Sequence, residues 1–357
     1  MYVNYYSYLN PNDTKHTLEE QKKYYRGRIA TKVVQSTDQS DIVRRKTQYL
    51  LGVVSSITSQ RDFRLLTANN TSFAEHYDQY EIPKRSGGTR TIRAPHEDLK
   101  VLQQNLLRRL EKTKCLPNNC VHSFLSYRNC KTALEVHQAN HSRWFLKVDI
   151  HDYFGSITLG QFLEVLMQVY PFTYLHPNTM ETIFNLCFIN KELLPQGAPA
   201  SPWISNMYLT IFDYDLQQTL GDDFIVTRYA DDILISSRKK FAFDKVVRQV
   251  SRLLSPYGLT LNARKTRFGS CNGANWNLGL MYNKDHNITV GYKRKHIFKC
   301  MLHNLKKIED RTTSDYWDKW YHLQGLLAYY QHIEPTYFTK YKESLMDIEP
   351  KIKPVKA

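Results

Sequence analysis

Two adjacent aspartates, Asp231 and Asp232, interrupt an apolar, β-rich stretch that runs from Phe224 to Ile235. This pattern predicts two strands joined by a tight turn, with the acidic pair at the turn. Neighbouring carboxylates repel each other, and burying them beside apolar strands costs free energy. A divalent cation removes that cost, so the pattern favours a sheet protein that holds a cation at this hairpin.

A third aspartate ends a second apolar run. Residues 144–150 read Trp-Phe-Leu-Lys-Val-Asp-Ile, which predicts a strand with Asp149 near its end. A lone aspartate is usually a turn or cap residue, but strand neighbours Asp149 and Asp231 could clamp two ions. Ions about 3.5–4 Å apart carry out two-metal phosphoryl transfer, and Mg²⁺ prefers such oxygen ligands. We expect Asp232 to support the site as a weaker ligand.

The charge balance points to an acidic partner. The chain has 357 residues and a net charge of +15, and 42% of its residues are hydrophobic, enough for a packed core. Nucleic acid is the usual partner of so basic a protein, because its phosphates attract Lys and Arg. Composition alone also allows a basic surface without a partner.

The sequence predicts a cytoplasmic protein with no membrane partner. No stretch approaches the roughly 18 apolar residues of a membrane-spanning helix. The N-terminus lacks the basic and apolar blocks of a signal peptide. The six cysteines include no C-x-x-C pair, which indicates reduced thiols rather than a zinc site.

Hydrophobic periodicity predicts an α+β fold. Residues 1–75 are polar and Tyr-rich and are expected to be helical, with a capping box at 17–20. The other predicted elements are a helix over 42–57, a hairpin of strands 80–85 and 89–93 around Ser86-Gly87-Gly88, a helix over 99–110, alternating strands and helices over 143–290, and a helix from Lys293 onward.

Several segments together resemble the motifs of reverse transcriptases. Tyr229-Ala230-Asp231-Asp232 resembles the Y-x-D-D box, and residues 194–202, Leu-Pro-Gln-Gly-Ala-Pro-Ala-Ser-Pro, resemble the box before it. Asp149 with Phe154 resembles the first metal-ligand box, residues 261–266 the later lysine box, and residues 82–103 the fingers segment. One four-letter box is a weak signal, but these occur in the family's order over roughly 75–300.

The wording of these motifs is most similar to bacterial retron and group II intron enzymes, with two departures. Residues 277–279 read Asn-Leu-Gly where retrons carry Val-Thr-Gly, and Gly155 stands where proline is usual. The 125 residues after Asp232 leave room for a thumb but not for an RNase H or integrase. The resemblance therefore implies a single-domain reverse transcriptase of the defence-associated (anti-phage) or retron type.

The resemblance also implies a right-hand polymerase architecture with a helical N-terminal extension. The expected parts are the extension at 1–75, fingers at 76–145 with part of 158–195, a palm at 146–290 and a helical thumb at 291–357.

The family's catalytic roles carry over to matching positions. Asp149, Asp231 and Asp232 would ligate metal, with Ile150 as an additional ligand. Lys265 would be the general acid that protonates pyrophosphate, although a surface lysine fits the sequence nearly as well.

The nucleotide and primer contacts carry over in the same way. Lys84 and Arg90 on the fingers hairpin would bind the triphosphate, and Gln196 and Gly197 would contact the nucleotide. Phe154 would exclude a 2′-hydroxyl and so favour dNTPs. Ser201 is a candidate N-cap of the helix that follows. Tyr229 and Ala230 would lie along the primer end.

The predicted C-terminal helix carries four lysines that would contact nucleic acid: Lys293, Lys295, Lys299 and Lys306. The last three lie at helical spacing and could track a phosphate backbone, but an ordinary solvated face fits equally well.

These expectations define an RNA-directed DNA polymerase that copies a dedicated structured non-coding RNA as part of an anti-phage system. It would use dNTPs and two Mg²⁺ ions, with Mn²⁺ as a substitute. It would hold an RNA/DNA duplex. The sequence does not determine whether it also binds an effector protein or forms a homo-oligomer. The alternatives are a retron enzyme that makes branched RNA-linked DNA, a template-independent or tyrosine-primed DNA polymerase, and an RNA-binding scaffold with an inactive palm. The intact aspartates oppose the scaffold, and Phe154 opposes an RNA polymerase.

Overall fold

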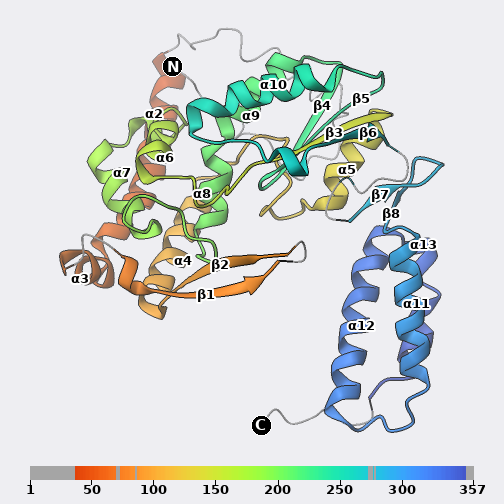
Figure 1. Ribbon diagram of the computed structural model, residues 1–357. Coiled ribbons are helices and arrows are strands. Elements are labelled where there is room, and N and C mark those ends of the chain that lie inside the picture. Colours follow the sequence, from red (N-terminus) through yellow and green to blue (C-terminus); the bar gives the residue numbers. More distant parts are fainter. Residues whose placement is uncertain (1–36, 70–72, 85–86, 272–275, 277–278, 351–357) are drawn as a thin grey trace. The chain divides into compact units, whose positions relative to one another are not determined.

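The computed structural model describes residues 37–69, 73–84, 87–271, 276 and 279–350 (Figure 1). They form two compact units. The first contains the described residues up to Phe124, Ile150–Thr219 and Arg248–Leu261, and the second contains Leu125–Asp149, Leu220–Val247 and the described residues from Asn262 onward. The predicted capping box at 17–20, the N-terminal tyrosines and residues 277–278 lie outside the described residues. The predicted domain boundaries stay predictions.

Three helices of the first unit pack together. They are α2 (Thr37–Ser55), α3 (Arg61–Asn69) and α4 (Glu97–Lys112), and both α2 and α3 contact α4. Leu99, Leu102, Leu106 and Leu110 recur at helical spacing and form the buried face of α4. The helices predicted over 42–57 and 99–110 are confirmed, and the described part of the predicted extension packs on α4.

A β-hairpin precedes α4. Strands β1 (Tyr77–Pro83) and β2 (Thr89–Pro95) pair antiparallel, with Ile82 opposite Arg90. The Lys84 amide donates to the Gly88 carbonyl at 2.9 Å, and Gly87 and Gly88 have φ values of 88° and 78°. Glycine adopts such angles without steric cost, so the Gly-Gly pair fits this turn. The predicted hairpin is confirmed.

The rest of the first unit is mainly helical. Its longer helices are α6 (Leu159–Leu166), α7 (Pro177–Phe184), α8 (Ser201–Tyr208) and α9 (Thr210–Leu220). Thr158 and Gln161 form a capping box at the start of α6. An aromatic cluster packs within this part, where the ring centroids of Phe162 and Phe184 lie 5.1 Å apart. Five short 3₁₀ turns lie among the described residues of this unit as well: η2 (Ser56–Ser59), η3 (Ala74–His76), η4 (Phe172–Tyr174), η5 (Asn185–Cys187) and η6 (Ser255–Tyr257).

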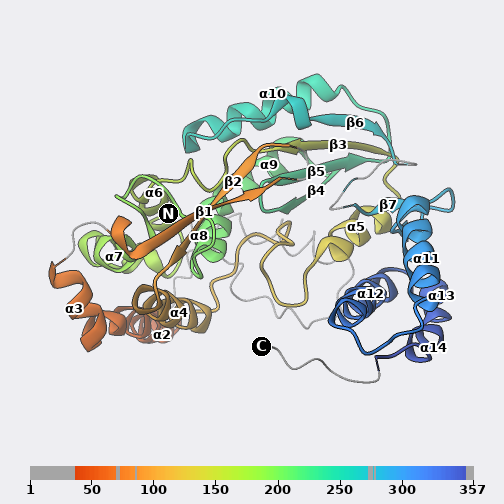
Figure 2. The same ribbon diagram turned by 60° about the horizontal axis from the view of Figure 1, so that its bottom comes forward.

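A four-stranded antiparallel sheet organises the second unit (Figure 2). Its strand order is β4 (Phe224–Tyr229), β5 (Asp232–Ser237), β3 (Trp144–Asp149) and β6 (Arg267–Ser270). Helix α5 (Cys130–Ala139) contacts β4, and helix α10 (Phe243–Leu254) follows β5. The strand predicted over 144–150 is found at Trp144–Asp149, and the strands predicted on both sides of the aspartate pair are confirmed, as is the α+β class.

A buried histidine fastens α5 to the sheet. The Nδ1 atom of His137 lies 2.6 Å from Ser236 Oγ on β5, and its Nε2 atom lies 2.8 Å from Thr227 Oγ1 on β4. Because all three side chains are buried, these bonds satisfy groups that would otherwise lose their solvation. His137 therefore has a structural role.

Helices form the C-terminal part of the second unit. A short hairpin of β7 (Met281–Tyr282) and β8 (Ile288–Thr289) leads into α11 (Tyr292–Lys306), α12 (Ser314–Ile333), α13 (Pro335–Phe338) and α14 (Tyr341–Met346). One hydrophobic cluster joins Phe145 of the sheet, Tyr282 of the hairpin and Phe298 of α11 with buried residues of α12. The predicted C-terminal helix is confirmed.

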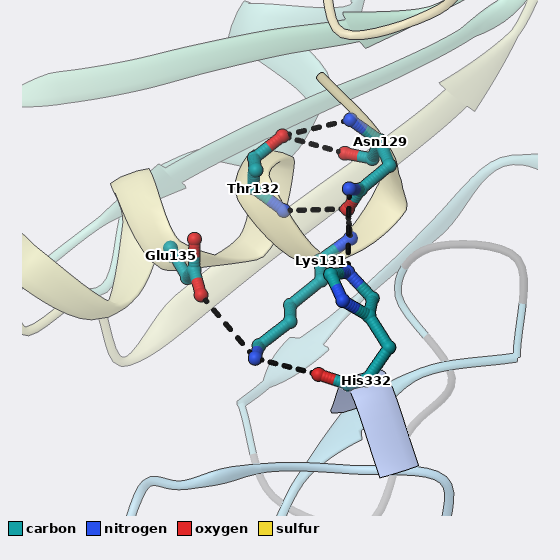
Figure 3. Close-up of polar contacts among 5 residues, drawn as sticks. All are labelled: Asn129, Lys131, Thr132, Glu135 and His332. Atoms are coloured by element: carbon teal, nitrogen blue, oxygen red, sulfur yellow. Dashed lines mark hydrogen bonds and ion pairs between the residues drawn. The ribbon is translucent and has the colours of Figure 1, made fainter. Parts of the chain in front are cut away.

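Polar contacts tie the end of α12 to the start of α5 (Figure 3). Asn129 caps α5 by accepting from the Lys131 and Thr132 amides at 2.8 and 3.1 Å. Lys131 Nζ then donates to the His332 carbonyl at 2.8 Å and lies 3.8 Å from Glu135 Oε1. This cation also faces the negative end of the α12 dipole, which favours the contact.

Candidate active site

The β4–β5 hairpin carries the aspartate pair on its turn. Tyr229 and Asp232 are opposite each other in the ladder, so Ala230 and Asp231 form a two-residue loop. Ala230 has φ 54°, a left-handed value that a residue with a side chain adopts only when its surroundings hold it. The fully buried Arg228 helps to stabilise this backbone conformation, because its Nη1 donates to the Ala230 carbonyl at 3.3 Å.

Strand β3 brings the third aspartate beside this pair. Asp149 is the direct cross-strand partner of Asp232 in the β3–β5 ladder, so their side chains share one face of the sheet. The sequence-predicted group of Asp149, Asp231 and Asp232 is thus assembled at one end of adjacent strands. Asp149 is buried, whereas Asp231 and Asp232 are partly exposed.

Two lysines pair with these carboxylates. Lys265 Nζ lies 2.8 Å from Asp149 Oδ2, and Lys147 Nζ lies 2.6 Å from Asp232 Oδ2. Lys265 ends the turn η7 (Ala263–Lys265), which is fixed to β3 where the Asn262 amide donates to the Asp149 carbonyl at 2.8 Å. The predicted catalytic lysine therefore reaches the aspartates.

Lys147 was missed by the sequence reasoning. It lies two residues before Asp149 on β3, and side chains two residues apart point to the same face of a strand. A lysine inside the apolar run of 144–150 was the signal that could have identified it. Arg228, which holds the turn, had the same kind of signal within β4.

The three carboxylates of the site outnumber the two lysines that pair with them. Burial raises the pKa of Asp231 to about 6, and repulsion from Asp232 and Asp149 adds to the effect. Burial opposes the charge on Lys265, but its hydrogen bond to Asp149 and the three carboxylates outweigh this and raise its pKa. Asp149 Oδ1 is buried and accepts no hydrogen bond from any described residue. The two lysines therefore leave the carboxylates only partly neutralised.

These residues fit a magnesium site. In the described part of the chain, no three His, Cys, Asp or Glu side chains are already gathered as a metal centre. One oxygen of Asp149 and one of Asp232 bind ammonium groups instead, while Asp149 Oδ1 has no hydrogen-bond partner among the described residues and the Asp231 carboxyl is repelled by its neighbours. Mg²⁺ commonly takes one or two carboxylates and completes its shell with water and substrate phosphates.

Other predicted residues near this centre take simpler positions. Tyr229 ends β4, and burial followed by the nearby Cys130 raises its pKa. Ile150 follows Asp149 and forms an isolated antiparallel bridge with Leu261 in the first unit.

The four lysines of α11 differ from one another. Lys293 and Lys306 are exposed. Lys295 is not a free cation, because its Nζ lies 2.6 Å from Glu334 Oε1 and 4.2 Å from the Tyr337 ring centroid.

Lys299 also faces a ring. Its Nζ lies 5.8 Å from the Tyr337 centroid, and Lys340 Nζ lies 4.8 Å from the same ring. The Lys299 ammonium donates a hydrogen bond to the Tyr337 hydroxyl, and this bond, followed by the negative charge of that hydroxyl when it is ionised, raises the pKa of Lys299. The helical periodicity of α11 could not predict the contact with Tyr337, because Tyr337 belongs to a different helix, α13.

The residues of the 194–202 segment that were predicted to contact the nucleotide lie against the β1–β2 hairpin of the first unit. The Arg93 amide on β2 donates to the Gln196 carbonyl at 2.8 Å. Gly197 has φ 118°, and a Cβ there would lie 2.8 Å from Ile92 Cγ2. Glycine is therefore needed here for both its backbone angle and its small size.

Ser201 is not the N-cap that the sequence predicts. It is the first residue of α8, and Ala200 precedes it without a side-chain cap. The Ser201 hydroxyl donates to the Pro195 carbonyl at 2.7 Å, so it closes the preceding loop instead. Because α8 begins at Ser201 itself, its side chain lies one position past the N-cap.

The other residues that were predicted to contact the nucleotide also lie in the first unit. Lys84 and Arg90 are exposed on the β1–β2 hairpin. Phe154 is half-buried in the turn after residue 150, where its ring packs edge-on against Tyr153 with centroids 5.4 Å apart. These three residues are thus available at or near the surface of their own unit.

Comparison with known proteins finds one matching family model and several similar proteins. A family model for "Reverse transcriptase (RNA-dependent DNA polymerase)" matches residues 82–309. The retron Ec73 reverse transcriptase of Escherichia coli is 26% identical over 275 residues, which cover 73% of this chain and 84% of that protein. The retron Mx65 reverse transcriptase of Myxococcus xanthus is 30% identical over 279 residues, which cover 73% and 62%. A solved structure of apo telomerase from Candida tropicalis is similar with a TM-score of 0.45 and 14% identity, covering 78% of this chain and 62% of that one.

Proposed function

The chain belongs to the reverse transcriptase family, whose members are RNA-dependent DNA polymerases, and we propose that it polymerises DNA at Asp149, Asp231 and Asp232. The observation that carries this proposal is the convergence of the three carboxylates at one end of β3 and β5, with Lys147 and Lys265 bound to two of them. Partly neutralised carboxylates of this kind are suited to hold cations with a triphosphate.

Asp149 and Asp231, supported by Asp232 and Ile150, would hold two Mg²⁺ ions, for which Mn²⁺ could substitute. When bound, these ions supply charge neutralisation and a primer hydroxyl of lowered pKa. The chain's own groups position the reactants. Arg228 holds the turn that presents Asp231, and Lys147 orients Asp232.

Lys265 would provide the proton for the departing pyrophosphate. Its raised pKa keeps the ammonium protonated at neutral pH, and its exposed end can leave Asp149 when a triphosphate enters. Positioning and charge neutralisation then supply most of the rate, because phosphoryl transfer needs little covalent chemistry from the protein.

The substrate contacts follow the family resemblance. Lys84 and Arg90 would bind the triphosphate of a dNTP, Gln196 and Gly197 its base or template partner, and Phe154 would reject a 2′-hydroxyl. Tyr229 and Ala230 would flank the primer end. Lys293, Lys299 and Lys306 would contact the RNA/DNA duplex, whereas the pairing of Lys295 with Glu334 favours a structural part for that lysine.

The template would be a dedicated structured non-coding RNA. The net charge of +15 suits a large polyanion. A retron-type product, DNA joined to its RNA by a branch, is the second candidate, because several curated relatives are retron reverse transcriptases. No helix within the described residues is long and apolar enough to cross a membrane. The cytoplasm and anti-phage defence stay predictions from the sequence.

The test is to purify the full chain from cells that carry its own locus and to sequence the co-purifying RNA and DNA. DNA synthesis would then be repeated with four dNTPs and Mg²⁺. An Asp231→Asn/Asp232→Asn variant serves as the control. One enriched RNA with complementary DNA, absent in the variant, is the expected result, and phage plating with the two alleles tests the defence role.

The other outcomes separate the alternatives. DNA attached to the RNA through a branch would indicate a retron. DNA unrelated to any RNA would support template-independent or self-primed synthesis. Bound RNA without any DNA under all conditions would leave an RNA-binding scaffold.

A further inference from the structure

A pocket of about 470 Å³ lies at the opposite end of β3 from the aspartates. Three segments of the second unit line it: residues 141–144, the end of β6, and the β7–β8 turn. We call it the β3-start pocket, and its main lining residues are His141, Arg143, Trp144, Cys271, Lys284 and His286. Since a strand rises about 3.3 Å per residue, Trp144 is roughly 17 Å from Asp149, so this pocket is separate from the catalytic centre.

The lining is basic and contains no Asp or Glu. Arg143 and Lys284 are both exposed, and neither side chain has a carboxylate partner among the described residues. Lys147, Lys265 and Lys295 differ in this respect, because each binds a carboxylate within its own unit. The β3-start pocket thus keeps two permanent positive charges without an internal counter-ion.

One imidazole of the pocket also lacks a partner. His286 Nε2 is buried and has no hydrogen bond among the described residues. The ring stacks on Tyr282 with centroids 4.8 Å apart, and the His286 carbonyl accepts from Gln138 Nε2 at 2.8 Å. Burial, followed by the charges of His141 and Arg143, lowers the pKa of His286. The neutral ring is therefore fixed beside the pocket with one nitrogen that a ligand could satisfy.

The chemistry of these groups matches a phosphate. Arginine presents a planar fork to phosphate oxygens, and lysine adds a compact charge. Trp144 is not a free stacking platform for a base, because its ring stacks on Phe268 at 5.7 Å and Lys240 Nζ lies 5.1 Å from its centroid. Recognition of backbone rather than of base identity follows from this arrangement.

We propose that the β3-start pocket binds a phosphodiester group of a nucleic-acid strand, at a site distinct from the catalytic centre. The bound strand would be held without sequence preference, through Arg143, Lys284 and His286. This inference concerns binding alone, so it does not depend on polymerisation by the aspartates. It adds an anchoring point for a long RNA on the part of the sheet remote from the reaction.

The test places a reporter in the pocket itself. The full chain is labelled with 5-fluorotryptophan, and the ¹⁹F resonance of Trp144 is assigned with a Trp144→Phe variant. The probes are hexauridylate, which carries phosphodiesters, and uridine monophosphate, which does not. Hexauridylate should shift the Trp144 resonance and bind at least about tenfold more tightly than the monophosphate.

Two matched double variants complete the design. Arg143→Ala/Lys284→Ala should weaken hexauridylate binding, measured at Trp144, by at least about tenfold, and should reduce its salt dependence. Lys245→Ala/Arg248→Ala removes the same charges from exposed positions of α10 and should change the affinity less than about twofold. Lys284→Glu, a single change in an exposed turn, gives a second test should the double variant fold poorly. An Asp231→Asn variant should retain the shift, which separates this inference from the catalytic proposal.

Three results would overturn the inference. One is a Trp144 resonance that stays in place at saturating hexauridylate, and another is unchanged affinity for hexauridylate in both Arg143→Ala/Lys284→Ala and Lys284→Glu. Equal affinity for uridine monophosphate would reject a strand and indicate a free nucleotide site instead.

Discussion

Lys147 Nζ lies 2.6 Å from Asp232 Oδ2, across the two strands that bring the aspartates together. Lys147 and Asp232 are diagonal neighbours on one face of the β3–β5 ladder, because Asp149 is the direct partner of Asp232. Together with the Lys265–Asp149 pair, this contact lets ammonium groups neutralise part of the carboxylate cluster. A metal that enters the site must therefore compete with lysine for these oxygens.

Replacing Lys147 tests that competition. Lys147→Met should lower the free energy of unfolding without metal by about 1–3 kcal/mol, since it leaves a partly buried carboxylate unpaired. The same change should raise the affinity for Mg²⁺, because one competing cation is gone. Thermal melting over a Mg²⁺ titration measures both effects.

Lys319→Met is the matched control. Lys319 pairs with Asp315 at 2.5 Å on the exposed surface of α12, where such pairs contribute below about 1 kcal/mol. An equal loss of stability in the two variants, or a weaker response of Lys147→Met to Mg²⁺, would contradict this view of the site.

The raised pKa of Asp231 predicts a pH dependence of stability. The pKa of Asp231 is about 6 in the folded chain and near 3.8 in the unfolded chain. The folded state therefore binds more protons than the unfolded state between pH 4 and 6. The free energy of unfolding should then fall as pH rises through that window, by up to about 3 kcal/mol from this group. Asp231→Asn should remove this fall and should melt at a higher temperature than the parent at pH 7 without metal.

Urea unfolding at several pH values, with and without Mg²⁺, checks this prediction. Magnesium should stabilise the parent chain at pH 7 and should have much less effect on Asp231→Asn. A variant that is less stable than the parent at pH 7 would show that Asp231 is not under repulsion.

Replacing Gly197 tests the close contact between its loop and the β1–β2 hairpin. Gly197→Ala should cost about 1–3 kcal/mol, because φ is 118° and the new Cβ would press on Ile92. Gly160→Ala is the comparison, since a Cβ at that helical position of α6 meets nothing within 4 Å. Chemical denaturation should find Gly160→Ala neutral or slightly stabilising, and a similar cost for both would argue against the close contact.

His137 gives a prediction about the sheet. His137→Leu should destabilise the chain by about 2–4 kcal/mol, since Ser236 Oγ loses one hydrogen-bond partner and Thr227 Oγ1 loses another. A Thr227→Val change made in the same background should add little, because the two residues share one bond. Additive losses in this double-mutant cycle would contradict a direct bond.

Local patterns were enough to predict the elements that carry the site. Apolar, β-rich runs on both sides of Asp231 and Asp232 define a hairpin, and the strand ending in Asp149 can only bury its apolar faces beside other strands. The Gly-Gly turn of the β1–β2 hairpin and the leucine spacing of α4 were equally direct. Each of these signals depends on residues close in the sequence.

Contacts between distant segments were harder to predict. Lys147 pairs with Asp232, 85 residues away, and Lys295 pairs with Glu334, 39 residues away. A helical period places Lys295 on a face but does not say that Glu334 will cover it. The β3-start pocket likewise needs three separate segments to meet. Ser201 failed as a cap for a local reason, because α8 begins at Ser201 itself and its hydroxyl donates to the Pro195 carbonyl.

The most direct measurement is primer extension by the purified full chain on a mixed-sequence RNA template with an annealed DNA primer, four dNTPs and Mg²⁺. DNA complementary to the template should form, and Asp149→Asn should slow its synthesis by about a thousandfold or more, as expected when a metal ligand is lost. Lys245→Ala/Arg248→Ala should extend the primer at the parental rate. Unchanged synthesis by Asp149→Asn, or products whose sequence ignores the template, would contradict the account.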